Sequence, residues 1–185
     1  WQLFMRQWLP RTALMLGNFA TGISILAPAA MLTVLADGLH VGIRDAGLLV
    51  TFGAIILCIG SPLMALITTR IDRRLLLVTT LAVLTVCQAA TAFAPNYATV
   101  LALRLVMLTV AAVYTPQAAS TVSMIVPVNQ RAGAISFVFL GWSLAVAGGL
   151  PLLTLVAAHV SWRAAYGVAA VASLVPCVLL AVSLP

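Results

Sequence analysis

The stretch GLLVTFGAIILCIGSPLMALITTRIDRR, residues 47–74, determines the fold class of this chain. Residues 46–69 carry no charged side chain, and three arginines follow within the next five residues. An α-helix needs about 20 residues to cross about 30 Å of hydrocarbon, so this uncharged run is long enough for a membrane-spanning helix. The arginines that follow it belong at a water-facing end of that helix. This combination predicts a protein that folds in lipid.

The rest of the chain repeats this alternation of long apolar runs and short charged loops. Of its 185 residues, 64% are hydrophobic and 6% are charged, and the mean hydropathy is +1.20. So few polar groups do not cover the surface of a water-soluble domain. The sequence therefore predicts an all-α, polytopic membrane protein in which residues 1–185 form one six-helix bundle. The spans are expected at about residues 12–35, 46–69, 75–94, 97–126, 133–157 and 164–184.

The distribution of the arginines predicts the orientation. Alternating the loops places Arg44 and Arg163 on one side of the membrane and a larger group on the other: Arg6, Arg11, Arg70, Arg73, Arg74 and Arg131. By the positive-inside rule the larger group is cytoplasmic, so we expect both termini inside a cell inner (plasma) membrane. Topology also explains the net charge of +6 without nucleic-acid binding, which requires basic residues gathered on one face.

An internal repeat supports the span count. Residues 60–74, GSPLMALITTRIDRR, align without gaps to residues 149–163, GLPLLTLVAAHVSWR. The offset corresponds to three predicted spans, so the two copies leave the membrane on opposite sides. This pattern predicts a 3+3 inverted repeat of the kind found in secondary transporters.

Arg104 is the charge that the loops do not explain. It lies about seven residues into the fourth predicted span, roughly 10 Å from its end. An arginine at a helix centre costs about 2.5–3.5 kcal/mol on insertion scales, so it usually faces a cavity or a partner. Snorkelling to the outer interface is the alternative at this depth.

If Arg104 faces inward, helical spacing places several small or adaptable residues on the same stripe: Met107, Leu108, Ala111, Thr115 and Ala118, with Tyr114 at its edge. Asn18 shares a face of the first span with Thr21 and Gly22 and could oppose that stripe. We therefore take Arg104, Asn18 and Tyr114 as candidates for a substrate or proton path. A hydrogen bond from Asn18 to a neighbouring helix is the alternative interpretation.

Glycines crowd the fifth predicted span. The spacing of seven between Gly141 and Gly148 puts both on one face and predicts close backbone approach there, with Gly149 beside them. Pro151 removes one backbone hydrogen bond and is expected to bend the helix. The pattern fits either close packing or a surface that bends or rocks.

Other chemistry is disfavoured. No Asp or Glu lies inside a predicted span, so a neutral or anionic solute suits this chain better than an organic cation. The cysteines lack paired spacing, and we expect no metal site and no cofactor. An intramembrane serine protease would need a histidine near Ser143, and His40 and His159 lie at the outer ends. We therefore expect a protein without catalytic residues, not an enzyme.

Four stretches, in chain order, resemble motifs of the major facilitator superfamily, and within it the drug/proton and arabinose-efflux-like exporters. The family's loop between helices two and three reads Gly-x-Leu-Ala-Asp-Arg-x-Gly-Arg-Arg, and residues 65–74, ALITTRIDRR, take that place. The resemblance implies a cytoplasmic gate loop made of Arg70, Arg73 and Arg74. Thr69 replaces the acid that helps to hold the gate shut in the family, which leaves Asp72 as a possible substitute.

The other three matches lie further along the chain. Arg104 matches an arginine that the family follows with glycine four residues later, where this chain has Leu108. Residues 141–154, GWSLAVAGGLPLLT, resemble the glycine-rich antiporter motif of helix five through Gly141, Gly148, Gly149 and Pro151. Residues 161–170, SWRAAYGVAA, are similar to the Trp-Arg-x-x-Phe entry into helix six.

The resemblance covers the amino-terminal six of the family's twelve helices. It implies a secondary active transporter of the export type, working by alternating access on a drug or sugar-like solute and proton-coupled in the complete protein. Its partners would be the lipid bilayer, the solute and a carboxy-terminal six-helix half, which we expect further along a truncated chain. A half-length protein that pairs with itself and a non-transporting six-helix membrane protein are the alternatives.

Overall fold

The computed structural model describes the backbone of residues 2–183, and the side chains of that range except residues 2–7, 65 and 69. The predictions that concern the side chains of Arg6 and Thr69 therefore lie outside the described residues. Helices make up nearly all of the described chain: α1 Gln2–Ala30, α2 Leu32–Leu39, α3 Ile43–Ile67, η1 Thr68–Arg70, α4 Arg73–Ala92, α5 Tyr97–Ile125, η2 Val128–Gln130, α6 Arg131–Leu144, η3 Ala145–Gly149, α7 Leu150–His159 and α8 Trp162–Ser183.

The predicted fold class is confirmed. The described residues contain no β-strand, and six helical stretches are long and apolar enough to cross a membrane: Trp8–Ala30, Ile43–Met64, Arg73–Ala92, Tyr97–Ile125, Val128–His159 and Trp162–Ser183. The fifth stretch is a composite of η2, α6, the π-helical turn η3 and α7. The protein is therefore a multi-pass membrane protein.

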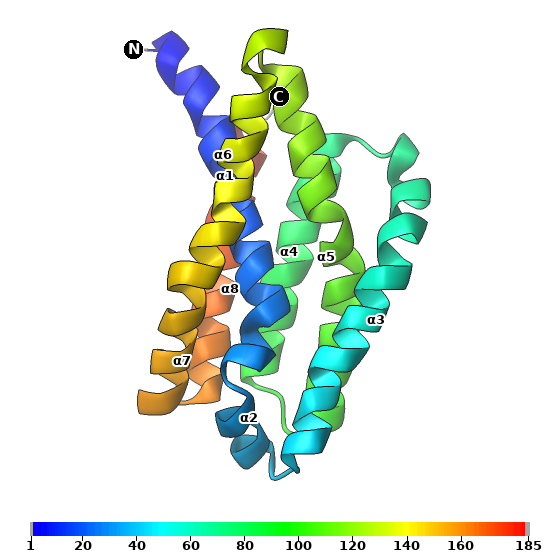
Figure 1. Cartoon of the computed structure of the whole chain (residues 1–185), viewed down its shortest axis with the longest axis vertical. Helices are drawn as coiled ribbons and strands as arrows, with labels where there is room; N and C mark the ends of the chain where they lie inside the picture. Colours follow the sequence, from blue (N-terminus) through cyan, green and yellow to red (C-terminus); the bar gives the residue numbers. More distant parts are fainter. Residues whose placement is uncertain (1, 184–185) are drawn as a thin grey trace.

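The long helices lie side by side, and α1 begins at the end of the bundle where α8 ends (Figure 1). We call this the terminal end, and the opposite end, where α2 lies, the α2 end. Helix α1 packs against α5, α6 and α8, while α4 packs between α5 and α8 and α3 packs against α5. The ring of helices is therefore open between α3 and α6.

Side-chain caps at the starts of α4 and α5 satisfy free backbone N–H groups. The Asp72 carboxylate accepts hydrogen bonds from the backbone N–H of Arg74 at 2.7 Å and Leu75 at 3.4 Å, at the start of α4. The Asn96 side chain accepts one from the backbone N–H of Thr99 at 2.9 Å, at the start of α5. Asp and Asn are among the preferred N-cap residues because their oxygens reach these donors.

The first helix ends earlier than its predicted span. It ends at Ala30, not near residue 35, and α2 continues as a separate short helix after Met31. The Thr154 hydroxyl of α7 donates a hydrogen bond of 3.0 Å to the Ala30 carbonyl at this break. A polar side chain on a neighbouring helix thus contacts the backbone where the helix stops, which hydropathy alone does not reveal.

Candidate functional site

A groove of about 360 Å³ lies on the open side of the bundle. We call it the α3–α6 groove. Its lining comes from four helices: Ile25 of α1, Leu57 and Ser61 of α3, Ala111, Ala112 and Thr115 of α5, and Phe139 and Trp142 of α6. All eight side chains are uncharged, and most are apolar. A mostly apolar concavity with a few polar groups is the usual form of a small-molecule site.

A chain of hydrogen bonds lies directly behind this groove. The Thr115 hydroxyl donates to the side-chain oxygen of Asn18 at 2.7 Å, and the Asn18 amide nitrogen donates to the Val138 carbonyl at 3.1 Å. Asn18 is fully buried, so the network links α1, α5 and α6 inside the bundle. The face of Asn18 therefore opposes the Thr115 stripe, and its contacts are to neighbouring helices.

Arg104 is buried beside the groove, with 5% of its surface exposed. Its guanidinium donates to three main-chain carbonyls: Leu49 at 2.8 Å, Ser24 at 3.3 Å and Ile25 at 2.7 Å. It thus ties α5 to α1 and α3. Among the described residues, all hydrogen bonds of this side chain go to main-chain carbonyls. No carboxylate of the described residues pairs with it.

A glycine makes room for this arginine on α3. A side chain at Gly53 would meet Leu108 and the Arg104 guanidinium. The helices can therefore approach closely enough for the arginine to reach backbone carbonyls. Arg104 points inside the bundle and does not extend to the α2 end.

Tyr114 is fully buried as well. Its hydroxyl donates to the Leu14 carbonyl at 3.3 Å, and a side chain at Gly17 would overlap the Tyr114 ring and hydroxyl. Tyr114 therefore joins α5 to α1 and does not line the groove. Of the predicted inward stripe, Ala111 and Thr115 reach the groove surface.

The basic loop at the terminal end joins three helices of this bundle. The Arg73 guanidinium donates to the Ser120 hydroxyl of α5 at 2.6 Å, and Arg74 donates to the Ala181 carbonyl of α8 at 2.5 Å. A cation at the carboxyl end of a helix is favourable because it complements the helix dipole. Arg70 is exposed, and Asp72 caps α4. The described contacts of this loop thus lie within the six-helix bundle.

The prediction that Gly141 and Gly148 share one packing face is wrong. A side chain at Gly141 would overlap the Met15 carbonyl of α1, and one at Gly149 would overlap Ile23, whereas Gly148 is exposed and has no atom within 4 Å of that position. The packing face therefore continues from Gly141 to Gly149, a spacing of eight instead of seven.

The π-helical turn explains this shift. In η3 the backbone N–H of Leu150 reaches the carbonyl of Ala145, five residues back. Such a turn inserts one extra residue relative to an α-helix, so every later side chain moves by one position. Pro151 follows at the start of α7, where its missing N–H cannot continue an α-helical ladder.

Residues 13–185 match the sequence model of the Major Facilitator Superfamily. The chain belongs to the major facilitator superfamily. The family predicted from the motifs is therefore confirmed.

Two relatives and one solved structure give the context within this superfamily. The chain is 30% identical over 176 residues to "Inner membrane transport protein YdhP" of Escherichia coli (strain K12), a match that covers 95% of this chain and 45% of that protein. It is 32% identical over 149 residues to "Probable sugar efflux transporter" of Mannheimia succiniciproducens, covering 80% and 37%. The chain spans less than half the length of these relatives.

The fold resembles that of one solved transporter structure. A crystal structure of the peptide transporter POT, as its E310Q mutant in complex with alafosfalin, superposes with a TM-score of 0.80 at 14% identity. The superposition covers 96% of this chain and 38% of that one. At this level of identity the likeness concerns the fold.

Sequence reasoning missed most of the groove lining. Ser61 lies in the second predicted span and Trp142 lies in the glycine-rich motif, and the sequence analysis singled out neither residue. A signal was present for Ser61, because it is a polar residue inside an apolar span and directly precedes Pro62. Trp142 directly follows the closely packed Gly141 and gave no such signal.

Proposed function

We propose that this chain forms one six-helix half of a secondary transporter that exports a small, uncharged, sugar-like or drug-like solute by alternating access. The α3–α6 groove is the part of the solute path that this half contributes. The observation that carries the proposal is a mostly apolar groove with no charged lining residue, on the open side of a bundle from the major facilitator superfamily.

The groove chemistry favours a neutral solute. Ser61 and Thr115 offer hydroxyl groups, and Trp142 offers an indole N–H and an aromatic surface. Thr115 already donates to Asn18, so its oxygen is free to accept a hydrogen bond from a solute hydroxyl. A relative named as a probable sugar efflux transporter agrees with this solute class.

Arg104, Asn18 and Tyr114 act behind the groove. Arg104 holds α1, α3 and α5 together through three carbonyls, and Asn18 fixes the hydroxyl of Thr115. These contacts position the groove lining and keep the packing of α5 against α1. No carboxylate lines the groove among the residues that the structure describes, so we assign the acid for proton coupling to the other half of the complete transporter.

A second six-helix half closes the open side between α3 and α6. It is either a further part of the same polypeptide or a second copy of this chain. The two halves rock around the solute, with both termini of this bundle on the cytoplasmic side of the inner membrane. The repeated segments support an inverted 3+3 arrangement, because the α3–α4 connection lies at the terminal end and the α7–α8 connection at the α2 end (Figure 1).

Transport by the complete gene product tests the proposal. Inside-out membrane vesicles would be offered a panel of radiolabelled neutral sugars and uncharged drugs, with and without a proton gradient. We expect uptake of at least one solute, reduced about tenfold by Ser61→Ala because one hydrogen bond to the solute is lost. Thr79→Val, on the exposed side of α4, is the matched control and should transport normally.

Two results would contradict the proposal. One is absence of uptake for every solute from vesicles that contain folded protein, which would favour a non-transporting membrane protein. The other is full transport by Ser61→Ala, which would place the solute path elsewhere. Sequencing the gene beyond codon 185 separates the two sources of the second half.

A further inference from the structure

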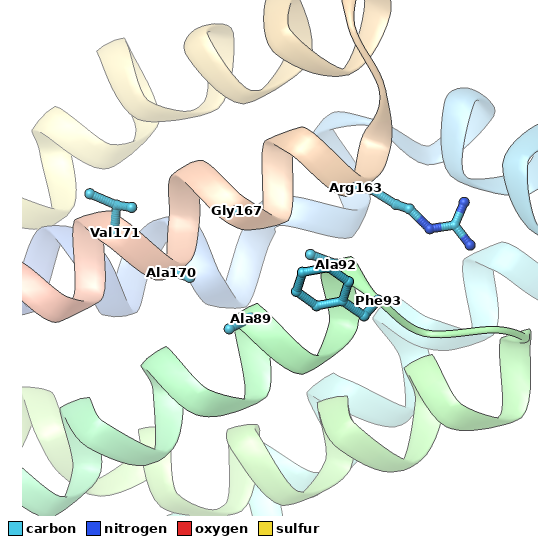
Figure 2. A pocket seen from close by; sticks show the side chains of 7 residues that line it. All are labelled: Ala89, Ala92, Phe93, Arg163, Gly167, Ala170 and Val171. Atoms are coloured by element: carbon cyan, nitrogen blue, oxygen red, sulfur yellow. The ribbon is translucent and has the colours of Figure 1, made fainter.

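A second groove, of about 620 Å³, lies between α4 and α8 near the α2 end (Figure 2). We call it the α4–α8 groove. Small residues line its sides, namely Ala89, Ala92, Gly167 and Ala170, with Phe93, Val171 and Arg163 completing the lining. Figure 2 shows Arg163 at one end of the groove and Val171 toward the other. The groove is thus lined mainly by apolar side chains, with a cation at one end.

This groove faces away from the α3–α6 groove. Helix α4 packs against α5 and α8, on the side of the bundle opposite the opening between α3 and α6. Large apolar side chains next to it are exposed, with Phe93 at 85%, Val86 at 66% and Val171 at 61%. In a membrane-spanning bundle, such an exposed apolar face is in contact with lipid.

Arg163 lies at one end of the groove and keeps several N–H donors of its guanidinium group free. One guanidinium nitrogen donates to the Ala94 carbonyl at 3.0 Å, and the guanidinium carbon lies 4.5 Å from the centre of the Trp162 ring. A guanidinium has five N–H donors, so most remain available. No carboxylate pairs with Arg163 among the residues that the structure describes.

The local field at the Arg163 end of the groove favours an anion. Arg163 lies in the first turn of α8, where the helix dipole is positive and where a cation by itself is unfavourable. An arginine presents its donors as a fork that matches the oxygens of a phosphate group. The first turn of a membrane-spanning helix such as α8 lies at the boundary between hydrocarbon and headgroups. Membrane phosphates lie at the same boundary.

We infer that the α4–α8 groove binds a membrane phospholipid, with an acyl chain along Ala89, Ala92, Gly167 and Ala170 and the headgroup phosphate on Arg163. The apolar lining matches the chain, the cation matches the phosphate, and both lie where lipid contacts the protein. The site is separate from the proposed solute path and does not depend on transport.

Two variants test the two ends of the site separately. Arg163→Gln removes the charge but keeps hydrogen-bonding capacity. Gly167→Leu places a large apolar side chain in the groove, and we expect the variant to fold because no atom lies within 4 Å of a Cβ added at that position. The matched controls are Arg44→Gln, an exposed arginine near the same end, and Gly47→Leu, a glycine with equally open surroundings on α3.

The measurement is native mass spectrometry of the complete gene product, titrated with phosphatidylglycerol. We expect one tightly held lipid whose apparent Kd rises about tenfold in Arg163→Gln, as for loss of a charge-assisted hydrogen bond. We expect a similar rise in Gly167→Leu and no change in either control. A phosphatidylglycerol with a diazirine in its acyl chain should label peptides covering residues 89–93 and 167–171.

Three outcomes would overturn the inference. The first is equal lipid binding by all variants. The second is binding of soluble glycerophosphate as tight as that of phosphatidylglycerol, which would leave the acyl chain without a role. The third is a dimer that Gly167→Leu dissociates while lipid binding persists, which would make the groove an interface between two copies of the chain.

Discussion

Substitution of Gly141 by alanine should destabilise the bundle by about 2 kcal/mol. The added methyl group would overlap the Met15 carbonyl oxygen and lie 2.9 Å from the Phe19 backbone nitrogen. Both are main-chain atoms, so relief requires α1 and α6 to move apart. Overpacking costs about 1–3 kcal/mol. We take the upper value, about 3 kcal/mol, because the contacted atoms belong to the main chain and cannot move aside on their own. Alanine regains about 1 kcal/mol of helix propensity over glycine.

Gly148→Ala is the matched control, seven residues further along the same composite helix. Its methyl group would meet no atom within 4 Å, so we expect stability equal to or slightly above that of the parent protein. The assay is reversible unfolding in mixed micelles followed by far-UV circular dichroism, with all variants in the same detergent. Equal stability of Gly141→Ala and Gly148→Ala would refute both the close α1–α6 contact and the shifted register after η3.

Three further predictions concern polar side chains. Asp72→Asn retains a capping oxygen, so we expect unchanged stability and unchanged accessibility of the inward and outward faces to labelling. Asp72→Ala loses the cap and should lower the free energy of unfolding by about 1 kcal/mol. Altered accessibility in Asp72→Asn would instead reveal a contact with the other half. Arg104→Met removes three buried hydrogen bonds from a charged side chain to main-chain carbonyls. It should therefore lower stability by about 3 kcal/mol or more, and Arg104→Lys should recover part of that loss. An unchanged unfolding curve would contradict this. Arg74→Gln removes the cation at the carboxyl end of α8. Hydrogen exchange of the last α8 turn should therefore accelerate while that of α5 stays constant. The same α8 exchange rate in the variant and the parent protein would rule out a stabilising contact between Arg74 and α8.

The membrane fold was predictable because the spacing of the charged residues indicates the number and the approximate positions of the spans. A helix in lipid must satisfy its backbone internally and must place its charges near water. Arginines and aspartates between uncharged runs therefore mark the loops, as at residues 70–74. Helical periodicity also predicted that the face of Asn18 opposes Thr115, and the two side chains are hydrogen-bonded.

Other features depend on tertiary contacts that no single helix encodes. The break after Ala30 coincides with a hydroxyl from α7, and the burial of Tyr114 depends on the absence of a side chain at Gly17. The π-helical turn arises within a run that is apolar and glycine-rich throughout, so hydropathy does not distinguish it from a regular helix. A one-residue shift then moved the packing face from Gly148 to Gly149.

The role of the basic loop changed most between sequence and structure. Its arginines are suited both to fixing orientation and to a gate contact with another half. The structure shows that Arg73 and Arg74 bind α5 and α8 of the same bundle, and that Asp72 serves as a helix cap. A motif match identifies such residues but does not reveal which neighbour each one contacts.

Solute-protected labelling in the α3–α6 groove tests the central proposal most directly. Ser61→Cys would be introduced into the complete gene product after the exposed Cys58 of the same helix is replaced by serine. The variant would then be treated with a membrane-impermeant thiol reagent, with Val86→Cys on the lipid-facing side as the control. We predict that Ser61→Cys reacts, that the transported solute at saturation protects it, and that Val86→Cys does not react. A Ser61→Cys thiol that is unreactive, or that reacts equally with and without the solute, would contradict the assignment of this groove as the solute path.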